Sequence, residues 1–206
     1  VEGRQPVALH LEMSDLDPEV YRARRASTFD GREPALFVNQ VRSRTDLPRT
    51  LPEFDLLAVH EVDAHAPKPA PDDDVVGSYR FVPTPRPGQG SLTGEPTSGL
   101  QLVLISPKQP DHAQDLRDWG DFVHIRHIAE AAVPGFGMIT PYRNGGDGPT
   151  FLHLYELHTD DPEATFQAMT PRVAERLGGI DTDAYRQWAW HPQLRIDYVN
   201  TFARVG

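Results

Sequence analysis

The sequence predicts an α+β fold made of two similar halves around a shared core, and three observations support this prediction. Short apolar segments of strand length alternate with fewer helical segments along the 206 residues. The strand patterns at 34–42 and 54–63 are repeated at 134–143 and 151–159, an offset of about half the chain. A segment rich in proline and glycine, 83–99, separates the copies. The repeat indicates two copies of one β-α-β-β-(α)-β unit, because solenoid repeats are far shorter.

The first half, residues 1–82, is expected to contain four strands and one short helix. Alternating or continuous apolar patterns predict strands at 6–13, 35–43, 54–63 and 75–82. Asp17-Pro18 is typical of a helix start and predicts a helix over 18–27. The prolines of 65–74 exclude a helix or a central strand there. This half therefore lacks its second helix and is a degenerate copy.

The second half, residues 100–206, is expected to be the complete copy, with 83–99 as the linker. The predicted strands are 100–107, 135–144, 151–159 and 194–205. The predicted helices are 111–133, 160–179 and a helix or turn over 181–192. Pro134-Gly135 ends the first of these helices, since proline disfavours helical geometry in the preceding residue. Each unit would have an antiparallel sheet with helices on one face, and the two bare sheet faces would pack against each other.

Composition narrows the function classes. The net charge of −10 repels nucleic acid, so we expect no nucleic-acid partner. No apolar run approaches the roughly 20 residues that span a bilayer, so we expect no membrane segment. The absence of cysteine excludes disulfides and thiolate chemistry. The first residues lack the order of a secretory signal, and we expect a cytoplasmic protein. Phosphate-binding glycine loops and a GxSxG elbow are missing.

The helix at 111–133 carries the first candidate site. Asp121, His124 and His127 are spaced three residues apart, so each side chain can meet the next across one turn. We predict that Asp121 orients His124 and keeps its pKa near neutral, as proton transfer requires. The alternative is a purely structural histidine on the helix flank. A metal held by His124 and His127 is a further possibility, but no third ligand is visible, so we expect no metal site.

Two strands of the second half supply further candidates. Tyr142 and Arg143 alternate in one strand, so one faces the helices and the other the expected cavity. Arg143 suits an anionic oxygen, or it forms a salt bridge to Glu156 or Asp197. His153 and Tyr155 share one strand face. If the leucines on the other face pack against helices, these two side chains face the cavity.

The aromatic cluster at 188–192 has two interpretations. Trp188 and Trp190 form a flat wall or lid for an aromatic ligand, or they plug a barrel end or contact another subunit. Trp119 on the long helix is a further candidate ligand contact. His10 and Asn39, on strands of the first half, are the remaining candidates to line the cavity.

A resemblance to a known family adds to this prediction. The second half resembles the EthD-like branch of the dimeric α/β-barrel superfamily, in which ferredoxin-like units pair sheet to sheet. The resemblance rests on Trp119, His124, Pro134-Gly135-Phe136, Tyr142-Arg143 and Leu154-Tyr155-Glu156. Gly120 and Arg126 depart from the pattern, since relatives often carry an aromatic residue and a proline there. The resemblance implies a cavity between the sheets and cofactor-independent chemistry on cyclic or polyketide-like molecules.

The sequence therefore predicts a cofactor-independent enzyme that transfers a proton on a cyclic or aromatic small molecule, of isomerase, cyclase, dehydratase or decarboxylase type. His124 would be the base or acid, Asp121 its orienting partner, and Arg143 with Tyr142 or Tyr155 would hold an anionic oxygen. A non-catalytic ligand carrier is the competing class, and a haem protein, as in more distant relatives, is the third. Either a monomer or a homodimer is compatible with two halves in one chain.

Overall fold

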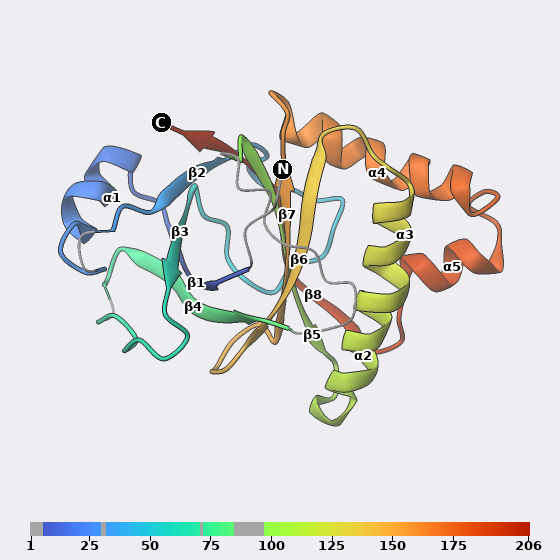
Figure 1. Cartoon of the computed structure of the whole chain (residues 1–206), viewed down its shortest axis with the longest axis horizontal. Coiled ribbons are helices and arrows are strands. Elements are labelled where there is room, and N and C mark those ends of the chain that lie inside the picture. Colours follow the sequence, from blue (N-terminus) through green and yellow to red (C-terminus); the bar gives the residue numbers. More distant parts are fainter. Residues whose placement is uncertain (1–5, 30–31, 71, 85–96) are drawn as a thin grey trace.

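The computed structural model describes residues 6–29, 32–70, 72–84 and 97–206, and within them eight strands form one closed antiparallel barrel (Figure 1). The order around the barrel is β1-β3-β2-β8-β5-β7-β6-β4. The strands are β1 (Ala8–Ser14), β2 (Ala35–Asn39), β3 (Leu56–Val62), β4 (Val75–Pro83), β5 (Gly99–Pro107), β6 (Phe136–Asn144), β7 (Phe151–Leu157) and β8 (Leu194–Val205). The expected mixed α+β fold with antiparallel strands is confirmed.

Helices cover the outside of the barrel on two sides. The helices are α1 (Pro18–Arg25), α2 (Ala113–Trp119), α3 (Ile125–Glu130), α4 (Pro162–Arg176) and α5 (Asp183–Ala189). Figure 1 shows α1 beside the first-half strands, whereas α2 to α5 gather on the opposite side. Helices α1 and α4 each begin with an aspartate whose side chain accepts a backbone N–H, followed by a proline at the first helical position. The sequence signals for these helix starts are therefore real caps.

The two halves contribute four neighbouring strands each, in equivalent order. The first half is ordered β4-β1-β3-β2, and the second is ordered β8-β5-β7-β6. Pairing of β2 with β8 and of β4 with β6 joins the halves and closes the barrel. Strands before residue 83 and after residue 99 thus belong to one sheet. Of the predicted linker, 85–96 lies outside the described residues.

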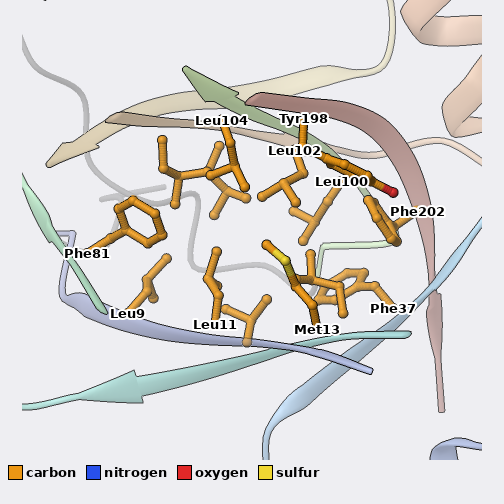
Figure 2. Close-up of a cluster of buried hydrophobic side chains, with 14 of the residues drawn as sticks. Leu9, Leu11, Met13, Phe37, Phe81, Leu100, Leu102, Leu104, Tyr198 and Phe202 are labelled. Carbon is orange, nitrogen blue, oxygen red and sulfur yellow. The ribbon is translucent and has the colours of Figure 1, made fainter. Parts of the chain in front are cut away.

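The barrel interior is a packed apolar core. Alternate side chains from facing strands fill it, as Figure 2 shows for Leu9, Leu11 and Met13 of β1 opposite leucines of β5. All of these side chains are nearly or completely buried. The expectation of a ligand cavity between the sheets is therefore wrong, because these side chains occupy the space where that cavity was expected.

The opposite side chains of the same strands meet the helices. Leu152 and Leu154 of β7 lie in the barrel core, whereas Tyr155 packs with residues of α3, α4 and α5. The alternation was predicted correctly, but the leucines do not pack against helices. This strand is buried on both faces. Leu152 and Leu154 face the barrel interior, whereas His153 and Tyr155, which also carry polar groups, face the helices. His153 and Tyr155 were expected to face a cavity because the leucines would pack against helices. They do face a cavity, but it lies on the helix side, because the leucines fill the barrel core.

The helix predicted over 111–133 is interrupted. A short 3₁₀ turn, η1 (Pro110–His112), precedes α2, and a π-helical turn, η2 (Gly120–His124), separates α2 from α3. Within this turn the N–H of Ile125 bonds to the carbonyl of Gly120, five residues earlier. The helix ends early because Ala132 adopts a left-handed conformation, with φ of 46°. The π turn changes which side chains share a face.

Two smaller features complete the fold. Strand β2 ends at Asn39, earlier than predicted, because the Asn39 side chain accepts the Val41 N–H at 2.8 Å and turns the backbone. Within the described part of the chain, none of the helices combines the length and the apolar character that crossing a bilayer demands.

Candidate functional site

A cavity of about 200 Å³ lies outside the barrel, between the second-half sheet and the helices, and we call it the helix-side chamber. Strands β5, β7 and β8 form its floor, while η2, α4 and α5 form its roof. Its lining residues are Leu47, Gln101, Val103, Ile105, Trp119, His124, His153, Tyr155, Phe166, Met169, Thr170, Tyr185, Trp188, Ala189, Leu194, Ile196 and Val199. A mainly apolar and aromatic lining with a few polar groups is typical of a small-molecule site.

The size of the chamber limits its ligand. A cavity of roughly 150 Å³ in another protein accommodates benzene. About 200 Å³ therefore suits a molecule with one or two rings. Trp119, Phe166, Tyr185 and Trp188 give it flat walls against which such rings can pack.

His124 is held in the roof by aromatic rings and by two reciprocal hydrogen bonds. Its ring stacks on that of Trp188, with centroids 5.2 Å apart and planes 6° apart, and lies 5.0 Å from the ring of Trp119. Nδ1 of His124 lies 3.0 Å from the Trp188 carbonyl oxygen, and the Trp188 indole N–H donates to the His124 carbonyl at 3.1 Å. Trp119 donates its indole N–H to the Gln187 carbonyl at 2.7 Å. The ring of His124 is thus fixed by α5.

These surroundings define the protonation state of His124. Desolvation among the rings lowers its pKa to about 4, although the bond to the Trp188 carbonyl acts in the opposite direction. The ring is therefore neutral at pH 7. Because a carbonyl only accepts hydrogen bonds, Nδ1 carries the proton, and Nε2 keeps a lone pair. The expectation that a carboxylate keeps this histidine titrating near neutral pH is wrong.

Asp121 and His127 do not line the helix-side chamber. Asp121 is buried 3.5 Å from the Nε of Arg117 and borders a separate open groove between α3 and β6. His127 lies 3.6 Å from a Glu130 carboxylate oxygen. The three residues were expected on one α-helical face, but the π turn at 120–124 rotates them apart. The contact of His124 with the Trp188 carbonyl takes the place of the expected orientation by Asp121.

Gly120 allows the helix to approach His153 closely. A Cβ at position 120 would lie 3.0 Å from Cε1 and 3.2 Å from Nε2 of His153. Any larger residue would push against this ring, which is buried and lines the chamber. The glycine that departs from the family pattern therefore brings the π turn down onto the chamber floor.

Tyr142 and Arg143 are not in the chamber, and their predicted role there is wrong. Tyr142 lies in the barrel core and is fully buried. Arg143 points the other way along β6 and is exposed. Neither residue lines the helix-side chamber. The strand alternation was predicted correctly: Tyr142 faces the barrel core, and Arg143 faces the helix side of the sheet but lies outside the lining of the chamber.

The remaining candidates divide between the chamber and other places. Trp188, His153 and Tyr155 line the chamber, whereas Trp190 is 51% exposed with the Lys108 ammonium 5.2 Å from its ring centroid. Asn39 is a structural residue, because its amide donates to the Phe54 carbonyl at 2.8 Å and accepts from the Asn200 amide at 2.9 Å. The aromatic cluster at 188–192 thus supplies one chamber wall and one surface residue.

His10 belongs to a buried polar cluster under α1. Glu12 accepts hydrogen bonds from Tyr21 at 2.6 Å and from two nitrogens of Arg25 at 2.9 and 2.5 Å, and Nε2 of His10 lies 3.5 Å from it. Burial raises the pKa of Glu12, but the hydrogen bonds outweigh this effect and lower it to about 2. Desolvation lowers the pKa of His60 to about 3. In the first half, an ion-pair network therefore occupies the region between sheet and helix that corresponds to the chamber of the second half.

Several lining residues were missed by the sequence predictions. Gln101 is on the helix side of β5, whereas its neighbours Leu100 and Leu102 point into the barrel core. Strand alternation could have identified Gln101 as a cavity residue once the helix side was recognised. Phe166 and Met169 of α4 also line the chamber, but the sequence predicted only the helix over 160–179 that contains them. Within the described residues, no three His, Cys, Asp or Glu side chains gather closely enough to hold a metal ion.

Comparisons with known proteins give a fold likeness only. No protein-family model matches the sequence, and no curated protein matches it. A solved structure described as a study of an anthrone oxidase-like protein aligns with 97% of this chain and 90% of its own chain, with a TM-score of 0.48 and 13% identity. At this level of similarity, the likeness carries no argument about function.

Proposed function

We propose that the helix-side chamber binds a cyclic or aromatic molecule of one or two rings, and that the protein is a cofactor-independent enzyme that moves a proton on it. The observation that carries this proposal is His124, a neutral imidazole fixed through Nδ1 in an aromatic chamber. Nε2 of such a ring can take a proton from a bound molecule and return it. His153 and Tyr155 on the floor are placed to contact the ligand's polar atoms.

The low pKa of His124 favours a reversible transfer. An imidazolium with a pKa near 4 returns its proton readily, and this suits an isomerisation in which one proton leaves one position and reaches another. The same low pKa makes the ring a weak base for a substrate of low acidity. It therefore favours a substrate whose C–H bond is activated by a neighbouring carbonyl group. Such a substrate passes through an enol or phenol form.

A ligand carrier is the second candidate function, and the same observation favours it. If Nε2 only accepts a hydrogen bond from a ligand hydroxyl, a low pKa keeps the ring neutral and able to accept over a wide pH range. Carrier and enzyme use one chamber. They differ in whether the ligand is recovered unchanged.

We also propose that haem is not the ligand of this chamber. A porphyrin has four pyrrole rings around its iron, and a space that suits one or two rings does not enclose it.

For the fold, we propose two fused ferredoxin-like halves related to the EthD-like branch of the dimeric α/β barrels. The support is the equivalent strand order in the two halves and their pairing at two seams. In this proposal the second half keeps the ligand chamber, and the first half has replaced it with the ion-pair cluster around Glu12 and Arg25.

The test is proton exchange on a two-ring ketone. In D₂O, the protein should accelerate loss of the α-hydrogen signals of 2-tetralone in ¹H NMR spectra, and His124→Gln should reduce this rate by about a hundredfold or more. Binding of 2-tetralone, measured by calorimetry, should change little. The control His158→Gln, on an exposed residue, should exchange at the wild-type rate.

Each outcome separates the candidates. If His124→Gln exchanges as fast as the wild type, His124 is not the proton acceptor. If the wild type binds 2-tetralone without accelerating exchange, the carrier function replaces the enzyme. If it binds no one- or two-ring compound at all, the chamber is not a ligand site.

A further inference from the structure

One polar group in the chamber floor has no partner in the protein. Gln101 is 2% exposed on β5, and its amide oxygen Oε1 accepts no hydrogen bond from the residues that the structure describes. The side chain lines the helix-side chamber. Leaving a buried amide oxygen without a donor costs free energy comparable to a lost hydrogen bond.

The neighbouring strands supply no evident donor for this oxygen. Gln101 is paired with Thr201 of β8 on one side and Tyr155 of β7 on the other. The hydroxyl of Thr201 donates to a carboxylate oxygen of Glu163 at 2.6 Å, and the same carboxylate oxygen pairs with Arg44. The Thr201 hydroxyl is therefore committed to the network beside the chamber, and the open side of Gln101 is the chamber itself.

We infer that Gln101 is the specificity residue of the chamber and accepts a hydrogen bond from the hydroxyl of a bound phenol or enol. This inference rests on the proposed ligand-binding function and names its substrate class. The rings of the ligand contact apolar side chains such as Val103 and Met169, while the hydroxyl reaches Oε1 in the floor. A site with an unsatisfied acceptor discriminates strongly against a ligand that lacks the matching donor.

The inference also connects Gln101 with the proposed proton transfer. Of the two tautomers of a ketone substrate, only the enol has a hydroxyl to donate to Oε1. Gln101 therefore favours the enol over the keto form in the chamber, whereas His124 removes the proton from the carbon atom and returns it. Gln101 is a binding and positioning residue in this scheme.

The experiment compares two ligands of the same shape, 2-naphthol and 2-fluoronaphthalene, because fluorine replaces the hydroxyl without providing a donor. Calorimetric titration of the wild type should show 2-naphthol binding at least about tenfold more tightly. In Gln101→Met, which keeps the length of the side chain, this preference should disappear through weaker 2-naphthol binding. A parallel variant, Gln114→Met, makes the same substitution at an exposed residue outside the chamber and should keep the preference.

A second measurement separates a ligand role from a structural one. Replacing an unpartnered buried oxygen by a thioether should leave the melting temperature of the free protein equal or higher. A fall of more than about 4 °C would mean that the Gln101 amide is held by groups within the protein and would overturn the inference. Equal affinity of the wild type for both naphthalenes overturns the inference but leaves the chamber a ligand site. Failure to bind either compound overturns the proposed function as well.

Discussion

The burial of His124 predicts a specific dependence of stability on pH. The ring has a pKa of about 6.5 when exposed in the unfolded chain and about 4 in the folded protein. Below pH 6.5 the unfolded chain therefore binds a proton that the folded protein does not, and unfolding becomes more favourable. The stability contributed by the neutral ring is complete above pH 6.5 and is lost as the pH falls towards 4.

The size of this effect follows from the two pKa values. Proton linkage with pKa values of about 6.5 and about 4 removes about 2 kcal/mol of the free energy of unfolding between pH 7 and pH 5. His124→Gln cannot titrate and lacks this loss. All other titrating groups, including His60, are common to both proteins and cancel in the comparison. The stability of the wild type relative to His124→Gln should therefore fall by about 2 kcal/mol over this range.

Urea denaturation of both proteins at pH 7, 6 and 5 measures this difference. A difference between the wild type and His124→Gln that stays constant from pH 7 to pH 5 would contradict the lowered pKa of His124. It would mean that His124 titrates normally and is not held neutral by the rings around it.

Three further substitutions test the close packing at Gly120, the buried ion pair of Glu12 and the backbone conformation at the end of α3. Gly120→Ala should destabilise the protein by about 1–3 kcal/mol and weaken ligand binding, because the new methyl group lies 3.0 Å from the ring of His153; denaturation and titration measure both. Glu12→Gln should lower the free energy of unfolding by about 3–5 kcal/mol at pH 7, because it leaves Arg25 charged and buried. The wild-type stability from Glu12 should disappear as the pH falls from about 4.5 through about 2. Ala132→Gly should raise stability by about 0.5–1 kcal/mol, since its φ of 46° favours glycine.

Matched controls accompany these substitutions. Gly145→Ala adds a methyl group where no other atom lies within 4 Å and should change stability little. Glu19→Gln alters an exposed carboxylate at the start of α1 and should cost less than about 1 kcal/mol. Ala131→Gly changes a residue with ordinary helical φ and should destabilise. If a control variant changes the free energy of unfolding as much, and in the same direction, as the substitution it accompanies, the physical reason given for that substitution is wrong.

The order of strands and helices followed from sequence patterns because each pattern is local. The alternation of Leu152 and Leu154 with His153 and Tyr155 is read directly from the sequence. Asp17 before Pro18 marked the start of α1 because the hydrogen bond of this cap is made within one turn.

The location of the site could not be predicted from local sequence patterns. Alternation divides a strand into two faces, but it does not say which face points into the barrel, because both faces are covered. The partner of His124 is a carbonyl from a residue 64 positions away, and no local pattern marks such a contact. The π turn at 120–124 depends on packing around Gly120, so the spacing of Asp121 and His124 was misread as a shared face.

The most direct test of the central claim, that the ligand site is the helix-side chamber and not the barrel interior, is a crystal structure with 2-naphthol. We expect the two rings between β5 and the helices α4 and α5, with the hydroxyl within hydrogen-bonding distance of Gln101 Oε1 and the rings beside Trp188. Naphthol bound inside the barrel among the leucines, or only in the open groove between α3 and β6, would contradict it.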